Sequence, residues 1–276
     1  MKSYPTSTVE IPSGETIAYR RAGTGERTVL LIHGSSFSSV HWQTTMAALE
    51  DTFSVYAPDL RGLGDSSYNR PFDSLGALAA DLGEFMDAVG IRTTAVVGWS
   101  AGGGVAMELA VSRADQVTGL VLVDSLPPTG LPVFGRLFTT KAAVAADPLH
   151  VAPLLGILNR GNAAAMKAIL RATIYNRRVP ERAEYAAYVA AAMQQRNLVD
   201  LDYSMFTFDI TGQLGRITCP VTVMHGTKDL LVPLDWARQT AAALGTPLIT
   251  LPGAGHSPMT DQPGAFFAAL REALAG

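Results

Sequence analysis

Residues 95–104 read AVVGWSAGGG, an apolar run that leads into a serine placed between glycines. The apolar run is typical of a buried strand, and the small residues after it are typical of a helix that begins close to a sheet. Gly98, Ser100 and Gly102 fit the pattern G-x-S-x-G, in which a sharp strand-to-helix turn exposes the serine hydroxyl. The beginning of a helix also presents unpaired N–H groups that favour a developing oxyanion. The stretch therefore predicts a nucleophile at Ser100.

Similar apolar runs occur along the rest of the chain and alternate with stretches of helical period. The runs are continuous rather than alternating in polarity, as expected for a mainly parallel sheet that helices cover on both faces. Residues 75–89 have the spacing of an amphipathic helix, with Asp73 or Ser74 as its N-cap and Gly90 at its end. We therefore predict an α/β fold, with a hairpin at 8–20 and buried strands at 28–32, 54–58, 95–98, 119–123, 221–225 and 247–251.

Residues 125–215 interrupt this alternation, because they contain no convincing strand, several prolines and helical pieces such as 181–196. An all-helical insertion between two strands predicts a cap over the edge of the sheet; a helical subdomain without a function is the alternative. The expected domains are a core of residues 1–124 and 216–276 and a cap of residues 125–215. Apolar side chains of the cap either line a substrate pocket or pack its helices together: Phe134, Leu137, Phe138, Leu154, Leu155, Ile157, Met205 and Phe206.

The composition is that of a globular protein with a large core. Of 276 residues, 48% are hydrophobic and 16% are charged, against about 25% charged in typical domains. The formal net charge of −3 provides no basic footprint for a nucleic-acid partner. Cys219 is the only cysteine, so no internal disulfide can form. The chain has neither a long apolar stretch nor a signal-peptide pattern, so we expect no membrane partner and a cytoplasmic location.

A serine hydroxyl becomes a strong nucleophile when a base takes its proton and a third group orients that base. His256 follows the apolar run 247–251 and Asp229 follows the run 221–225, so both are expected at the ends of late strands. The order serine, aspartate, histidine is one of the known orders for such a triad. Asp124 is a rival acid, because it follows the run 119–123; otherwise it anchors the beginning of the insertion.

Two loops are expected to form an oxyanion hole. Ala101 directly follows Ser100 and would supply one backbone N–H. The loop after the first buried strand reads His-Gly-Ser-Ser-Phe at 33–37, where Ser35 would supply the second N–H, with Ser36 as a substitute. Each such donor stabilises the transition state by about 3 kcal/mol. His33 is expected to shape this loop rather than to react.

Signals for a metal or a nucleotide are missing from the sequence. The five histidines and the single cysteine show no H-E-x-x-H or C-x-x-C spacing. Neither G-x-G-x-x-G nor G-x-x-x-x-G-K-[ST] occurs. We therefore expect no metal and no cofactor.

Five motifs in order resemble those of the α/β-hydrolase superfamily over nearly the whole chain. They are HG at 33–34, DLRGLGDS at 59–66, GWSAGG at 98–103, HGTKD at 225–229 and GAGHSPM at 253–259. The resemblance implies a twisted, mainly parallel eight-stranded sheet flanked by helices, with the helical cap inserted between strands six and seven. It also implies that Ser100, Asp229 and His256 form a catalytic triad, with the amides of Ser35 and Ala101 as the oxyanion hole. Relatives that open epoxides or remove halides have an aspartate where this chain has Ser100, so those two chemistries are disfavoured.

These observations predict a cofactor-free serine hydrolase that cleaves a small, apolar carboxylic ester or lactone through an acyl-enzyme. The same scaffold also carries carbon–carbon hydrolases, perhydrolases that form peracids and cofactor-free oxygenases, and these are alternatives. A binding module that keeps the triad for recognition is a further alternative. The sequence leaves the acyl group, the alcohol and the oligomeric state open.

Overall fold

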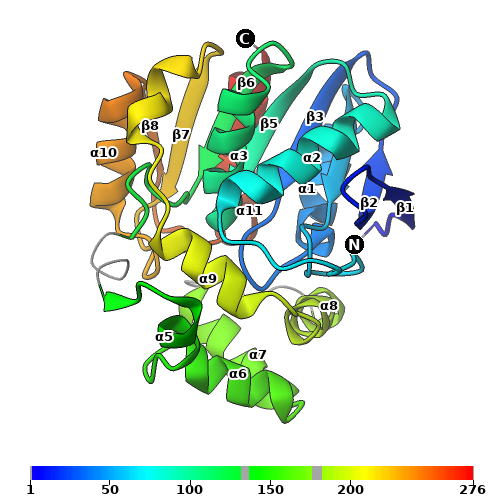
Figure 1. Cartoon of the computed structure of the whole chain (residues 1–276). Coiled ribbons are helices and arrows are strands. Elements are labelled where there is room, and N and C mark those ends of the chain that lie inside the picture. The colour runs from blue at the N-terminus through cyan, green and yellow to red at the C-terminus, as the bar shows by residue number, and fades with distance from the viewer. Residues whose placement is uncertain (1, 132–136, 176–181, 276) are drawn as a thin grey trace.

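The computed structural model describes residues 2–131, 137–175 and 182–275. One eight-stranded sheet runs through these residues in the order β1-β2-β4-β3-β5-β6-β7-β8 (Figure 1). Strand β2 pairs antiparallel with β1 and β4, and all other neighbours pair in parallel. The predicted mainly parallel sheet of eight strands is therefore confirmed. The strands are β1 (Thr6–Glu10), β2 (Thr16–Ala22), β3 (Arg27–Ile32), β4 (Phe53–Pro58), β5 (Thr94–Trp99), β6 (Val117–Val123), β7 (Val221–Gly226) and β8 (Leu248–Leu251).

The central strands are buried on both faces, which explains their continuous apolar sequences. In β3, Val29 and Leu31 belong to one hydrophobic cluster, whereas Leu30 and Ile32 belong to a second cluster. Successive side chains of a strand point to opposite faces, so the two clusters lie on the two sides of the sheet. All six residues of β4 are buried as well. A polar side chain in these strands would reach no water on either face.

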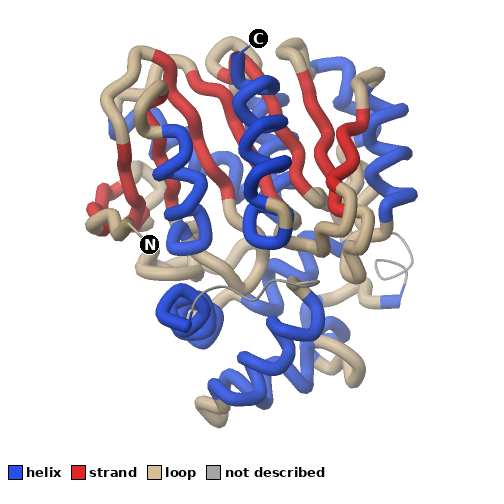
Figure 2. Tube along the Cα trace, turned by 180° about the vertical axis from the view of Figure 1, so that it is seen from behind, coloured by secondary structure: helices blue, strands red, loops and turns tan. Residues whose placement is uncertain are grey.

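Helices cover both faces of the sheet (Figure 2). The apolar sides of α1 (Gln43–Leu49) and α12 (Pro263–Ala275) belong to the first cluster, and those of α2 (Leu75–Val89), α3 (Ala101–Ser112) and α10 (Leu234–Leu244) to the second. As predicted, Ser74 is the N-cap of α2 and accepts the N–H of Ala77 at 3.3 Å. Gly90 ends that helix with a left-handed φ of 75°. Shorter elements are η1 (Ser39–Trp42), η2 (Thr211–Arg216) and α11 (Pro258–Asp261).

A group of helices lies between β6 and β7, gathered at one end of the sheet (Figures 1 and 2). They are α5 (Lys141–Ala145), α6 (Val151–Asn159), α7 (Ala163–Thr173), α8 (Arg182–Met193) and α9 (Leu198–Phe206). The predicted helical insertion is confirmed, and its described residues include no strand. Its division from the core at residues 125 and 215 stays a prediction. Among the described helices, none is long and apolar enough to cross a membrane.

The position of β3 between β4 and β5 decides which loops meet. The chain passes from β3 to β4 on one side, crosses back to β5 on the other side, and continues outward to β6. Ligands of open α/β sheets bind beyond the carboxyl ends of the strands at such a reversal, because the loops diverge there. Ile32 pairs with Gly98 in the parallel register. The loop after Ile32 and the turn at Ser100 are therefore neighbours.

Candidate functional site

Ser100 lies at the turn between β5 and α3, in the strained conformation that its motif predicts. Its backbone has φ 57° and ψ −126°, a region that costs a non-glycine residue about 1–3 kcal/mol. Two hydrogen bonds hold the turn: Ser100 N–H donates to the carbonyl oxygen of Val123 at 3.0 Å, and Leu126 N–H donates to the carbonyl of Ser100 at 3.1 Å. A Cβ on Gly102 would lie 2.4 Å from the oxygen of His33, so only glycine fits between helix and loop.

The structure brings Ser100, His256 and Asp229 into one hydrogen-bonded chain. The oxygen of the Ser100 hydroxyl lies 2.8 Å from His256 Nε2. The other ring nitrogen, His256 Nδ1, lies 2.7 Å from Asp229 Oδ2 and donates its proton there. The three residues follow β5, β8 and β7, and the carboxyl ends of these parallel strands lie at one edge of the sheet. The hydroxyl is therefore placed to give its proton to a ring that the carboxylate orients.

Trp99 holds the loop that carries His256 in place. The indole Nε1–H of Trp99 donates to the carbonyl oxygen of His256 at 2.6 Å, and the two rings lie 5.3 Å apart. The side chain of His256 is almost completely buried. Trp99 therefore connects the serine turn directly to the histidine loop.

Asp229 is held as a carboxylate by its hydrogen bonds. Burial alone would raise the pKa of this carboxyl group, but the hydrogen bond and charge of His256, together with backbone hydrogen bonds from Val232 and Leu231, lower the pKa below its ordinary value. The backbone N–H groups of Leu231 and Val232 also donate to its second oxygen, at 2.8 and 3.0 Å. A carboxylate with three donors is well suited to stabilise an imidazolium.

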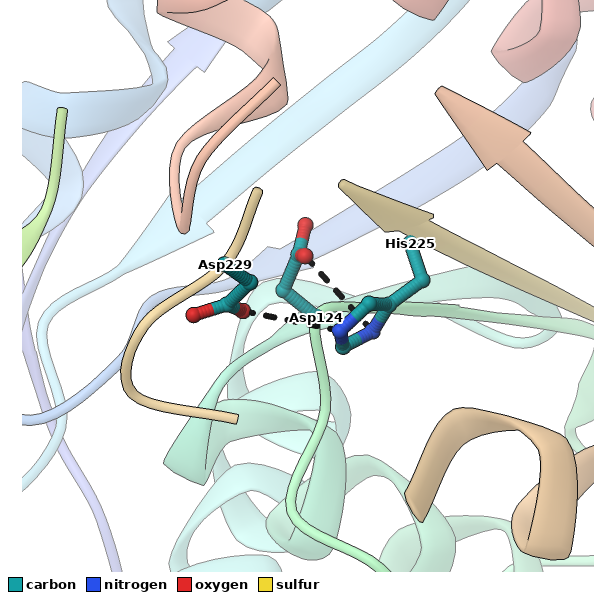
Figure 3. A group of neighbouring side chains, drawn as sticks. All are labelled: Asp124, His225 and Asp229. Carbon is teal, nitrogen blue, oxygen red and sulfur yellow. Dashed lines mark ion pairs between the residues drawn. The ribbon is translucent and has the colours of Figure 1, made fainter. Parts of the chain in front are cut away.

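Asp124, the rival acid, lies beside Asp229 and His225 (Figure 3). The ring of His256 is paired with Asp229 instead. Its side chain is completely buried and accepts the backbone N–H of Gly226 at 2.8 Å, which anchors the end of β7. Burial, together with the negative charge of Asp229, raises the pKa of Asp124 well above its ordinary value. Asp124 is therefore a buried structural residue next to the carboxylate that orients the histidine.

Asp124, His225 and Asp229 are the one group of described side chains whose spacing resembles a metal site, with their ligand atoms within 4.8 Å of one another (Figure 3). Some of their ligand atoms already have hydrogen-bond partners, whereas His225 Nδ1 and Asp124 Oδ2 have none among the described residues. His225 Nε2–H donates to the carbonyl of Val232 at 2.9 Å, and Asp229 Oδ2 accepts from His256. Burial also lowers the pKa of His225, although the charge of Asp229 opposes this shift. A metal ion at this group would compete with His256 for Asp229 Oδ2, the oxygen that orients the histidine ring.

The loop at 33–37 lies directly against the serine turn. A Cβ on Gly34 would lie 2.9 Å from the Cβ of Ser100. The buried ring of His33 holds the loop, since its Nε2 accepts the N–H of Leu60 at 3.0 Å and its Nδ1–H donates to the carbonyl of Gly34 at 2.9 Å. The expected oxyanion donors, Ser35 and Ala101, thus lie in two segments that contact each other; their role stays a prediction.

An aromatic cluster beside the site includes residues that the sequence did not single out. The ring of His41, in η1, stacks on Trp99 with ring centres 4.3 Å apart. Tyr188, from α8 of the insertion, contacts the ring of His41, with ring centres 4.8 Å apart. Burial and the neighbouring histidines lower the pKa of His41 to about 3, so this ring is neutral. Neither residue belongs to a motif, and no sequence signal marks them.

The insertion also contains an open, mostly apolar cavity of about 760 Å³. Its walls come from the end of α6, from α7 and from α8, and include Leu158, Lys167, Tyr185, Val189 and Met193. Of the apolar residues predicted to line a pocket or to pack the cap, Phe134 lies outside the described residues. The seven others are not among the residues that line this cavity, and Leu154 and Phe206 are buried in the core. Leu154 and Phe206 therefore pack in the interior rather than line this cavity.

The fold and motifs agree with comparisons to known proteins. The sequence matches the alpha/beta hydrolase family over residues 29–270. It is 31% identical over 271 residues to an uncharacterized protein of Mycobacterium tuberculosis, covering 95% of this chain and 79% of that protein. It is 30% identical over 257 residues to a Caulobacter sp. protein named "Putative carbamate hydrolase RutD", covering 91% of each. The crystal structure of a hydrolase from Pseudomonas aeruginosa has a TM-score of 0.79 and 26% identity, with 100% of both chains covered. The chain has the serine of the G-x-S-x-G turn and matches the family model over most of its length, so it belongs to the alpha/beta hydrolase family.

Proposed function

We propose that the protein hydrolyses a carboxylic ester or lactone through an acyl-enzyme formed on Ser100. The observation that carries this proposal is the hydrogen-bonded chain from the Ser100 hydroxyl through His256 to Asp229, at 2.8 and 2.7 Å. A serine, a base and an orienting acid in this geometry are the requirement for nucleophilic acyl transfer. The membership in a family of hydrolases supports the same reaction class.

The reaction proceeds in two halves. Ser100 attacks the carbonyl carbon while His256 Nε2 takes the hydroxyl proton, and Asp229 stabilises the imidazolium. The amides of Ser35 and Ala101 bind the oxyanion. His256 then gives its proton to the leaving alcohol, and the acyl group stays on Ser100. A water molecule, deprotonated by the same ring, attacks the acyl carbon and releases the carboxylic acid.

A carbamate is the second candidate substrate. The observation that favours it is the name of the Caulobacter relative, which aligns with 91% of this chain. A carbamate carbonyl is attacked in the same way, so the same residues would act on it. The buried rings of Trp99 and Tyr188 pack on His41 beside the triad, and these apolar surroundings support a substrate with an apolar part in either case.

The test compares Ser100→Ala with the wild-type protein on p-nitrophenyl esters of graded chain length, a lactone series and an aryl carbamate. We expect Ser100→Ala to lower kcat/KM at least 10³-fold on whichever class the wild type turns over. Ser112→Ala, an exposed serine at the end of the same helix, is the matched control. An aryl phosphonate should label Ser100, as located by mass spectrometry. Full turnover by Ser100→Ala would show that the assignment is wrong.

A further inference from the structure

Within the described parts of the insertion, one hydrogen bond connects it to the loop expected to form the oxyanion hole. The hydroxyl of Ser36 donates to Oε1 of Gln195 at 2.6 Å, across 159 positions of sequence. Ser36 lies in the loop after β3, and Gln195 lies in the turn between α8 and α9. No motif in the sequence includes Gln195.

Gln195 is itself held in place on both sides. Its side chain is 7% exposed, and its Nε2–H donates to Oδ1 of Asn197 at 3.2 Å. The amide of Asn197 in turn donates to the carbonyl of Arg61 at 2.6 Å. The next backbone N–H, that of Arg196, donates to the carbonyl of Gly62 at 2.9 Å. The turn is therefore anchored on the 59–66 loop of the core, and its glutamine presents a fixed acceptor.

Ser36 is a residue that needs such an acceptor. Its φ is 59°, a left-handed value that a non-glycine residue keeps only when its surroundings hold it there. This φ sets the direction in which the chain leaves Ser35, the residue whose amide is expected to bind the oxyanion. Since Gly34 lies against Ser100, a small rotation in this loop moves the amide relative to the reacting carbonyl.

We propose that Gln195 is a positioning residue for the oxyanion hole: it fixes the loop at Ser35 and Ser36 through the hydroxyl of Ser36. The proposal rests on the proposed function. The insertion then contributes to the chemical step. Removal of an oxyanion donor lowers kcat about 10²–10³-fold, and a displaced donor loses part of that effect.

The test replaces Gln195 by leucine, which has a similar size and no acceptor. We expect Gln195→Leu to lower kcat on an aryl ester about 10-fold or more, with KM within about twofold, because a misplaced amide affects the transition state more than the bound substrate. Gln194→Leu, its exposed neighbour, is the matched control and should keep the wild-type kcat. Wild-type kcat in Gln195→Leu, or a change in KM alone, would overturn the proposal.

A double substitution separates positioning from general damage to the insertion. In Ser36→Gly the hydrogen bond is absent and glycine adopts a positive φ without strain. Adding Gln195→Leu to this background should change kcat less than about threefold. A loss as large as in the wild-type background would show that Gln195 acts through the stability of the insertion.

Two further measurements keep the test decisive. If circular dichroism shows that Gln195→Leu does not fold, Ser36→Ala removes the same bond from the other side, and wild-type kcat in that variant would refute the proposal. If no ester is turned over, the rate of phosphonate labelling at Ser100 replaces kcat, since the phosphonyl oxygen also needs the oxyanion hole. Absent turnover with normal labelling would therefore contradict the proposed substrate class and leave the positioning role measurable.

Discussion

Replacement of Asp202 by asparagine should make the stability of the protein rise relative to the wild type as the pH increases. Asp202 lies in α9 and is completely buried, and neither of its oxygens has a hydrogen-bond partner among the described residues. Burial, with a further contribution from the nearby carboxyl group of Asp147, raises the pKa of Asp202 from 3.8 to about 8. The native protein therefore keeps a proton on this group at neutral pH, whereas the unfolded chain releases it.

The size of the effect follows from this difference in proton binding. Between pH 4 and pH 8 the native state binds one proton more than the unfolded state at this position. The contribution of Asp202 to the free energy of unfolding then falls by about 1.4 kcal/mol for each pH unit, or about 4 kcal/mol between pH 4 and pH 7. This stabilisation is fully present below the pKa of Asp202 in the unfolded chain, 3.8, and is lost as the pH rises towards the pKa in the native protein, about 8. Asparagine has the same shape and no proton to release.

Urea unfolding, followed by circular dichroism at several pH values from 4 to 8, measures the difference between Asp202→Asn and the wild type. Any constant effect of the buried amide cancels when the difference is compared between two pH values. Asp209→Asn is the control, because hydrogen bonds from Thr211 lower the pKa of this exposed carboxyl group. Its difference should change with pH in the opposite direction. A difference for Asp202→Asn that stays constant within about 1 kcal/mol would refute this account of the buried carboxyl group.

Three further substitutions test the site. Asp229→Asn should lower kcat about 10⁴-fold, because an amide cannot stabilise the imidazolium of His256; steady-state kinetics measure this, and a loss below 10-fold would contradict the role of Asp229. Asp124→Asn should keep most of kcat, since an amide oxygen can still accept the N–H of Gly226, whereas Asp124→Ala should lose stability in urea unfolding. Equal unfolding midpoints for these two variants would count against the anchoring role. Trp99→Phe removes the donor to the His256 carbonyl and should cost about 1–3 kcal/mol of unfolding free energy; wild-type stability would exclude that contribution.

The sequence predicted those parts of the fold and site that depend on local pattern. Continuous apolar runs predicted buried strands, and the small residues around Ser100 predicted the turn from β5 into α3. Asp229 and His256 were expected at the ends of late strands, and the structure places His256 against Ser100 and Asp229 against His256. The pattern of apolar residues along a strand indicates whether one or both of its faces are buried, so the buried strands could be predicted from the sequence alone.

Contacts across the fold could not be predicted in the same way. The stacking of His41 on Trp99 depends on the path of η1 over the sheet, which no periodicity encodes. The burial of Asp202 depends on how α9 packs, since an aspartate in a helical stretch usually faces solvent. The bond from Ser36 to Gln195 requires that the turn before α9 reach the loop after β3. These features belong to tertiary packing and appear only when the elements are assembled.

The described contacts assign different tasks to the sheet and to the insertion. Backbone groups of Val123, Leu231 and Val232, together with the indole of Trp99, hold the serine, the acid and the histidine loop, and all of these come from the core. Helices α5–α9 and the turns between them contact the neighbouring loop and the aromatic cluster through Gln195 and Tyr188, and residues 196 and 197 contact the 59–66 loop. At the beginning of the insertion, Leu126 donates its N–H to the carbonyl of Ser100. Because Ser100, Asp229 and His256 all lie outside helices α5–α9, we expect substitutions in these helices to leave the hydrogen bonds of the proton-transfer chain in place.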